Sequence, residues 1–170
     1  MDLKTQLVEI APSSFDQDSK VWIYQSDRIF NQNELVSIQD KLNAFVASWT
    51  SHGAKVKGFA TIYADAFIII MADEKQTGVS GCSTDSSVRT IKEIEAAHQL
   101  NLFDRLNCCF LIDEKIISIH LSKIQQAFNS KVINENSLYF NNTVLTKKQL
   151  LENWMLPLKE SWLNNKLIAQ

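Results

Sequence analysis

The residues best suited to chemistry lie at 78–89, where two glycines, a cysteine and several hydroxyl side chains follow an apolar run. Cys82 is the candidate nucleophile. If a helix begins at 83–85, the thiol lies just before its N-terminus, where the dipole and free N–H groups lower a cysteine pKa. His52 is the distant histidine that we assign as its base. The phosphatase pattern of Cys, five residues and Arg is absent, because Arg89 lies seven positions after Cys82. A cysteine kept for its small size explains the pattern equally well.

The same segment also fits an anion-binding loop. Glycines and small hydroxyl residues before a helix let backbone N–H groups point at a phosphate or carboxylate. Arg89 would add a bidentate contact, because helical side chains lean toward the helix N-terminus. The candidate ligand-binding residues are Gly81, Ser83, Thr84, Ser86 and Arg89. The simpler interpretation is that Ser, Thr and Asp are common at any helix start, and the P-loop pattern of nucleotide hydrolases does not occur.

Two acids form a further candidate. Asp73 and Glu74 end an apolar run, and they could act as a general base or hold a hard cation. Paired acids at a strand end are also common as solvated turn residues. His52 precedes Gly53 at the expected end of a helix, where a cation is stabilised and capping explains the histidine without catalysis. The three cysteines have no C-x-x-C spacing, so we predict neither a disulfide framework nor a metal site.

Composition narrows the function classes. The chain has 170 residues, 45% of them hydrophobic and 21% charged, which predicts one globular domain over 1–170 with a lead-in at 1–19 and a tail at 160–170. The net charge of -2, without a basic cluster, argues against nucleic-acid binding. The longest apolar run, 66–72, is far short of the roughly 20 residues that span a bilayer. We find no signal-peptide core and expect a cytoplasmic protein with no membrane partner. No cofactor is indicated.

Hydrophobic periodicity predicts the elements that position these residues. Strands are expected at 20–25, 57–63, 66–72, 107–112, 115–120 and 138–140, with two-residue turns at Ala64-Asp65 and Asp113-Glu114. A helix with a capping-box-like start at Asn31 and Glu34 has an apolar face that includes Trp49, and it ends at Gly53. A second helix leaves the far side of the 78–89 segment. Shorter helices are expected at 121–128 and at 146–154, the latter capped by Thr146.

The resulting order of the first elements is βαββαβ, the split-βαβ pattern. We therefore predict a two-layer α+β fold: a mainly antiparallel sheet with helices packed on one face. Its core would be ferredoxin-like, extended by an added hairpin strand and C-terminal helices. The strand at 66–72 is apolar on both faces, which is typical of an interior strand covered above and below.

Several sequence motifs together carry a family resemblance. They are VWIYQSDR at 21–28, SWTSHG at 48–53, FIIIMADE at 67–74, GCSTDSSVRTIKEIE at 81–95, LFDRL at 102–106, YFNN at 139–142, and the pair Trp154 and Trp162. Over about 20–163 the chain resembles a family of small uncharacterised cytosolic proteins from Bacteroidetes-type bacteria. Some members carry the label "ABC transporter ATPase", which the missing Walker A sequence does not support. The resemblance implies a compact single-domain fold and a bacterial cytoplasm, and it carries over no catalytic residues.

Three functional hypotheses follow. The first is a ligand-binding or regulatory module that holds a small anionic ligand at 78–89. The second is a cysteine-dependent enzyme using Cys82, with His52, Asp73 or Glu74 as proton carriers. The third is a structural or self-associating protein, such as a homodimer formed through a sheet face or the aromatic tail near Trp162.

Overall fold

The computed structural model describes residues 2–75 and 77–168. Its helices are α1 (Leu3–Ile10), α2 (Gln32–Ser48), α3 (Gly81–His98), α4 (Ile124–Asn129), α5 (Lys147–Asn153) and α6 (Asn164–Ile168), with short 3-10 turns η1 (Leu121–Lys123) and η2 (Leu158–Glu160). Its strands are β1 (Lys20–Gln25), β2 (Thr50–Ser51), β3 (Ala54–Lys55), β4 (Lys57–Tyr63), β5 (Phe67–Asp73), β6 (Asn107–Ile112), β7 (Lys115–His120), β8 (Leu138–Phe140) and β9 (Met155–Pro157). All the sheets are antiparallel, so the predicted α+β class is confirmed.

The centre of the molecule is the three-stranded sheet β1-β5-β4. All seven residues of β5 are buried, as the apolar run on both of its faces predicted. Alternate side chains of a strand point to opposite faces, and the two sets of β5 accordingly enter different cores. Ile68 and Ile70 pack with α2 and α3, whereas Phe67 and Ile69 pack with residues of α1 and α5.

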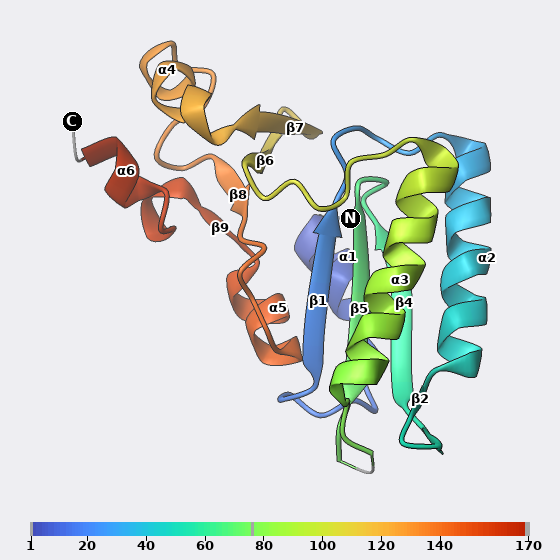
Figure 1. The fold of residues 1–170 in the computed structure, drawn as a ribbon. Coiled ribbons are helices and arrows are strands. Elements are labelled where there is room, and N and C mark those ends of the chain that lie inside the picture. Colours follow the sequence, from blue (N-terminus) through green and yellow to red (C-terminus); the bar gives the residue numbers. More distant parts are fainter. Residues whose placement is uncertain (1, 76, 169–170) are drawn as a thin grey trace.

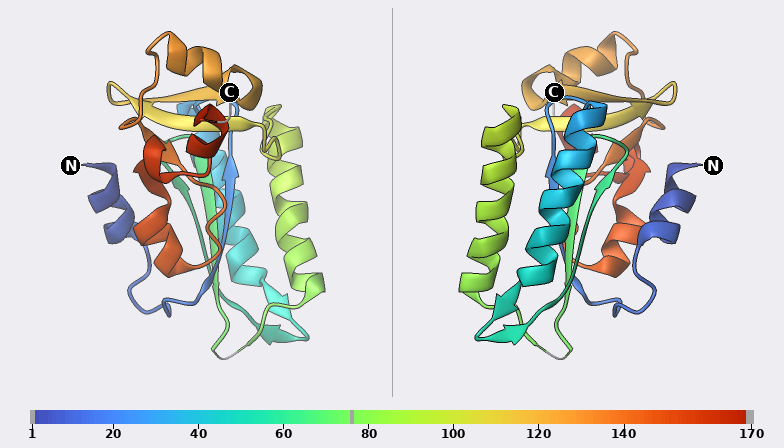
Figure 2. Two further views of the ribbon diagram at one scale, coloured as in Figure 1. Left: turned by 90° about the vertical axis from the view of Figure 1, so that its left-hand side faces the viewer. Right: turned by 90° about the vertical axis from the view of Figure 1, so that its right-hand side faces the viewer.

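Helices therefore cover both faces of this sheet, which corrects the prediction that they lie on one face. Figure 2 shows α2 and α3 on one side and α1 with α5 on the other. The second layer is built from segments that the sequence left undefined. Residues 1–19 were expected to be an irregular lead-in, but they include α1, which Asp2 caps and Leu7 anchors in the core. The tail is also ordered as far as α6, since Leu163 is fully buried, while residues 169–170 lie outside the described part.

A second sheet, β7-β6-β8-β9, crosses one end of the molecule (Figures 1 and 2). In a ferredoxin-like sheet the fourth strand of the pattern pairs with the first. Here β1, β5 and β4 have the expected order, but β6 pairs with β7 and β8 instead of β1. The expectation of one continuous sheet is therefore wrong, and the outer edge of β1 is left without a full neighbouring strand.

The remaining differences between the predicted and the observed elements lie in the turns. Tyr63 pairs with Phe67, so the β4–β5 connection has three residues, 64–66, rather than the expected two. The Asp113-Glu114 turn is confirmed, with both residues at positive φ. Helix α2 ends at Ser48, and Gly53 does not cap it: with φ +81, Gly53 lies in the turn between β2 and β3.

The N-terminus of α2 is the predicted capping box. Asn31 accepts from the Glu34 amide at 3.0 Å, and the Glu34 carboxylate accepts from the Asn31 amide at 2.8 Å. Arg28 also donates to both carboxylate oxygens, at 2.6 and 2.8 Å. The Arg28 hydrogen bonds, followed by that of the Asn31 amide, lower the pKa of Glu34 to about 2.

We expect Ile69→Ala to lower the free energy of unfolding by about 2–5 kcal/mol, because Ile69 is fully buried and the remaining cavity cannot be refilled. Urea denaturation followed by circular dichroism measures the loss. Val36→Ala on α2, where the side chain is 64% exposed, is the control and should change stability by less than about 0.5 kcal/mol. Equal losses in the two variants would contradict the buried role of β5.

The free energy of unfolding should also depend on pH through the Glu34 carboxylate. Its pKa in the folded state, about 2, lies below its ordinary value of 4.5, so its contribution is present above pH 4.5 and disappears as the pH falls toward 2. Because Arg28 is half-exposed, solvent screening limits this contribution to about 1–2 kcal/mol. Urea unfolding at several pH values should show this acid loss in the wild-type protein and a smaller one in Glu34→Gln.

Candidate functional site

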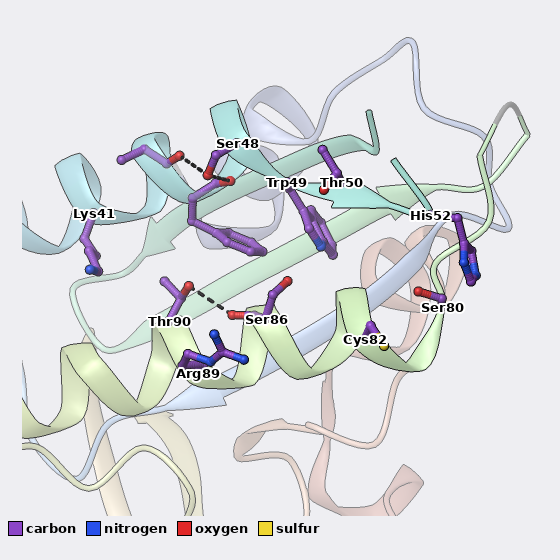
Figure 3. Close-up of a pocket in the computed structure, with 12 residues that line it drawn as sticks. Lys41, Ser48, Trp49, Thr50, His52, Ser80, Cys82, Ser86, Arg89 and Thr90 are labelled. Carbon is purple, nitrogen blue, oxygen red and sulfur yellow. Dashed lines mark hydrogen bonds between the residues drawn. The ribbon is translucent and has the colours of Figure 1, made fainter. Parts of the chain in front are cut away.

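An open pocket of about 630 Å³ lies between α2 and α3 and extends to the β2–β3 turn (Figure 3). Its walls are mostly exposed side chains, and its floor contains the buried rings of Phe45 and Trp49. The lining residues are Lys41, Ala44, Phe45, Ser48, Trp49, Thr50, His52, Ser80, Cys82, Ser86, Arg89 and Thr90. Four of the residues predicted from sequence, His52, Cys82, Ser86 and Arg89, therefore meet in one pocket.

Trp49 determines how α2 and α3 meet. Its indole Nε1 donates to the Ser83 carbonyl of α3 at 3.0 Å, which ties the end of one helix to the first turn of the other. The ring packs against Phe45 at 4.8 Å and edge-on to Trp22 at 6.2 Å, measured between centroids. It also lies over Gly58, where a Cβ atom would come within 2.6 Å of the indole. Gly58 is needed here for close approach rather than for an unusual φ.

Helix α3 begins earlier than predicted. Ser80 is the N-cap and accepts from the Ser83 amide at 3.3 Å, so Gly81 and Cys82 belong to the first turn instead of the loop before it. First-turn amides have no partner inside a helix. Within residues 2–75 and 77–168, no hydrogen bond uses the amides of Gly81 and Cys82, and both residues are exposed. These two N–H groups are the donors that the helix start offers.

The hydroxyl groups of this turn are engaged in the helix itself, which corrects their expected role. The Ser83 and Thr84 hydroxyls donate to the Ser80 carbonyl at 2.9 and 3.1 Å. Ser86, although it lines the pocket, donates to the Ser83 carbonyl at 2.7 Å. Ser83 is moreover buried. The protons that these residues would offer to an anion are already used, so the prediction of Ser83, Thr84 and Ser86 as anion donors is not supported by their geometry.

The charges of the pocket come from side chains. Lys41 of α2 and Arg89 of α3 both line it, and none of its lining residues is acidic. The nearest carboxylate that the structure pairs with them is Glu93, which accepts from Lys41 at 2.6 Å. That hydrogen bond, with a smaller contribution from the charge of Arg89, lowers the pKa of Glu93. Arg89 itself forms no ion pair within the described part of the chain, so no carboxylate holds its guanidinium directly.

Contrary to the expectation from sequence, His52 does not cap a helix. It lies in the β2–β3 turn at φ +50 beside Gly53, with its side chain exposed at the mouth of the pocket (Figure 3). The Cys82 thiol is exposed too. The structure gives no hydrogen bond between the two in the residues that it describes. They share a pocket without forming the contact that a nucleophile and its base require.

Asp73 and Glu74 lie away from this pocket and are engaged elsewhere. Asp73 is buried and accepts from Lys57 Nζ at 2.7 Å and from the Lys75 amide at 3.2 Å. The hydrogen bond from Lys57 is the main cause that lowers the pKa of Asp73. Glu74 accepts from Lys20 Nζ at 3.0 Å and from the Val79 amide at 2.7 Å. These contacts give both acids a structural role, and the predicted partnership with Cys82 is wrong.

Lys41 and Trp49 were not predicted as site residues. Trp49 was interpreted as part of the apolar face of α2, and Lys41 gave no signal because an exposed lysine on a helix is common. Among residues 2–75 and 77–168 no cluster of three or more His, Cys, Asp or Glu side chains is placed to hold a metal ion. None of the helices described is long and apolar enough to cross a bilayer.

Comparison with known proteins adds no assignment: no family model, curated protein or solved structure matches the chain. The pocket is therefore interpreted from its own geometry.

We expect iodoacetamide to alkylate the native protein at Cys82 alone, because its thiol is exposed while Cys108 and Cys109 are buried. Burial raises the pKa of Cys108 to about 11 and that of Cys109 to about 12, which keeps both as unreactive thiols at neutral pH. Mass spectrometry of the labelled protein should find one modified site before unfolding and three afterwards. Labelling of Cys108 in the native state would contradict the packing of β6.

Gly58→Ala should lower the free energy of unfolding by about 1–3 kcal/mol and alter tryptophan fluorescence, because the added methyl group displaces the Trp49 ring. The matched control is Gly81→Ala, where a Cβ atom meets open space. We expect that change to leave stability equal or to raise it by less than about 1 kcal/mol. Urea unfolding and fluorescence spectra compare the two variants.

Proposed function

We propose that the protein is a binding module that holds a small anionic ligand, a phosphate or carboxylate compound, in the α2–α3 pocket. The observation that carries the proposal is the Arg89 guanidinium, which has no ion-pair partner among the described residues and lines a pocket with no acidic lining residue. A pocket of one charge sign attracts ligands of the opposite sign. The volume of about 630 Å³ is within the range of small-molecule sites.

The ligand would use contacts of three kinds. The Arg89 guanidinium offers two parallel N–H donors to a carboxylate or phosphate. The free amide of Cys82, which lines the pocket, lies at the positive end of the α3 dipole, whereas Gly81 is not a lining residue. Phe45 and Trp49 provide an apolar floor for the uncharged part of the ligand. Because the pocket has both charged donors and an apolar floor, it favours a metabolite with a charged group and an apolar or planar body over a bare inorganic anion.

The other two hypotheses stay predictions. Catalysis by Cys82 would require a base, and the thiol has no hydrogen-bonded partner among the described residues. Self-association, the cytoplasmic setting and similarity to the Bacteroidetes-type family are likewise expectations from sequence.

The test is a thermal-shift screen of phosphate- and carboxylate-bearing metabolites at low ionic strength, followed by calorimetric titration of the hits. We expect a hit to lose at least about tenfold in affinity in Arg89→Ala, since a hydrogen bond to a charged group contributes about 1.5–3 kcal/mol. The interaction should also weaken as salt is added.

Lys92→Ala is the matched control, because Lys92 is an exposed cation of the same helix that does not line the pocket. It removes the same charge from α3 and should leave the affinity within about twofold. A screen without hits, or an equal loss of affinity in both variants, would refute the proposed site.

A further inference from the structure

An open groove of about 530 Å³ lies between strand β7 and helix α4. One wall is formed by residues 118–120 of β7, and the other by residues of α4 and by Val132. Figure 1 shows α4 on the side of the second sheet that faces away from the central sheet. This β7–α4 groove is separate from the α2–α3 pocket and shares no lining residue with it.

Strand β7 is an edge of the second sheet, and half of its backbone groups face away from β6. Backbone groups of alternate residues point to opposite edges of a strand. The Leu121 amide, one residue past β7, donates to the Leu106 carbonyl at 2.7 Å, which fixes the phase of the ladder. The N–H and C=O groups of Ile116, Ser118 and His120 therefore point outward. Within residues 2–75 and 77–168 these outward groups have no hydrogen-bond partner.

Other sheet edges of the molecule are protected in ways that β7 lacks. On β4, the Gln39 side chain accepts from the Ile62 amide at 3.2 Å and donates to the Ala60 carbonyl at 3.3 Å. At the far edge of the second sheet, β9 has three residues, and one of them is Pro157. Strand β7 has six residues, contains neither proline nor glycine, and pairs with β6 without a bulge. An edge of this kind pairs readily with an extended chain.

The groove lies on one face of this edge. Side chains alternate along a strand, so Ile117 and Ile119 point to the face on which α4 packs, and both are half-buried. Ala127 and the 49% exposed Val132 supply the apolar surface beside them. Ser118 points to the opposite face and is exposed. An extended chain added to this edge would therefore place every second side chain on the α4 side.

The charge of the groove is positive at one end. Lys123 lines the groove just beyond the end of β7, and no lining residue is acidic. In the described part of the chain no carboxylate forms an ion pair with Lys123. An antiparallel chain beside β7 has its N-terminal end near His120. An acidic side chain at that end of the segment is complementary to Lys123.

The position of the second sheet favours a single extended segment over a second copy of the chain. The inner face of this sheet packs on the core of the central sheet through Leu111 and Ile116. A second copy joined at β7 by a twofold axis would place both central sheets on the same side of the joined sheet. An extended segment adds only the width of one strand, about 4.8 Å.

We propose that the β7–α4 groove binds an extended segment of a partner protein in which an acidic residue is followed by apolar residues at every second position. The segment adds to β7 as an antiparallel strand. The residue opposite Ser118 donates its own N–H to the Ser118 carbonyl, and its own carbonyl accepts from the Ser118 N–H. The residues before and after it lie opposite Ile119 and Ile117 and turn their apolar side chains toward α4. The proposal does not depend on the anion site.

The probe is the peptide acetyl-Glu-Thr-Val-Thr-Val-Thr-amide, titrated into the full chain and measured by calorimetry. In the proposed register its second threonine lies opposite Ser118, and its two valines lie opposite Ile119 and Ile117. We expect saturable binding with a Kd below about 1 mM. Methylation of the nitrogen of the second threonine should weaken binding at least about tenfold, because that N–H donates to the Ser118 carbonyl.

Methylation of the nitrogen of the first valine is the matched control. The N–H of that residue points away from β7, so the Kd should change by less than about threefold. The two methylated probes have the same composition and differ only in which backbone group is blocked.

The glutamate of the probe tests Lys123. Its replacement by glutamine should weaken binding by about two- to fivefold, as expected for an exposed ion pair. Lys123→Gln should remove this difference. Lys131→Gln is the control and should keep it, because Lys131 is an exposed cation that follows α4 and does not line the groove. Both lysines are exposed, so both variants should keep the wild-type melting temperature.

Absence of saturable binding by the probe up to about 5 mM would overturn the proposal. Equal losses with the two methylated probes, or a preference for glutamate that persists in Lys123→Gln, would overturn it too. A dimer of the chain in sedimentation that Ser118→Pro dissociates would assign the β7 edge to a second copy and would count against the partner segment.

Discussion

The fold depends on the burial of β5 on both faces. A strand of seven buried residues has to be covered by one layer on each side, because apolar area left in water costs about 25 cal/mol per Å². Helices α2 and α3 form one layer, and α1, α5 and the Phe140–Trp154 aromatic cluster form the other. Segments near both ends of the chain, including Leu7 and Leu150, are thereby drawn to the same face. This explains why residues 3–10 and 147–163 are ordered, although neither segment has a strong local pattern.

The α2–α3 pocket is a consequence of the same packing. Both helices pack on the face of β5 that carries Ile68 and Ile70. At one end Trp49 sets their separation, because its indole donates to the Ser83 carbonyl and its ring packs on Gly58. Farther along the helices, Lys41 and Glu93 form an ion pair across the two surfaces, and polar side chains line the pocket between them. The hydroxyls of Ser83, Thr84 and Ser86 donate to helix carbonyls, which leaves cationic side chains and the Cys82 amide as the donors of the pocket. The electrostatic character of the pocket therefore comes mainly from Arg89, because Lys41 is paired with Glu93, and not from the hydroxyl-rich motif.

A second pocket, of about 360 Å³, lies along the outer edge of β1, where the split-βαβ pattern is broken. Strand β6 leaves the position beside β1 because β7 and β8 supply its two neighbours. The exposed edge of β1 is then only partly covered, by residues near Leu145, and Gln25 connects the two sheets through its side chain. An unpaired strand edge is prone to pair with other chains.

Local patterns in the sequence determined the strands β1, β4 and β6–β8, the capping box of α2, the Thr146 cap of α5 and the interior position of β5. Each of these is specified by the order of apolar, polar and capping residues within a short stretch of chain. They also pointed to the segment that contributes Cys82 and Arg89 to the pocket. Only the tertiary structure decided that β6 pairs outside the first sheet and that α1 and α5 cover the second face of that sheet. It also decided that Lys41 and Arg89 line one pocket and that Asp73 accepts a hydrogen bond from Lys57. These outcomes are set by packing between residues far apart in sequence, and side-chain periodicity carries no information about which distant surfaces will meet.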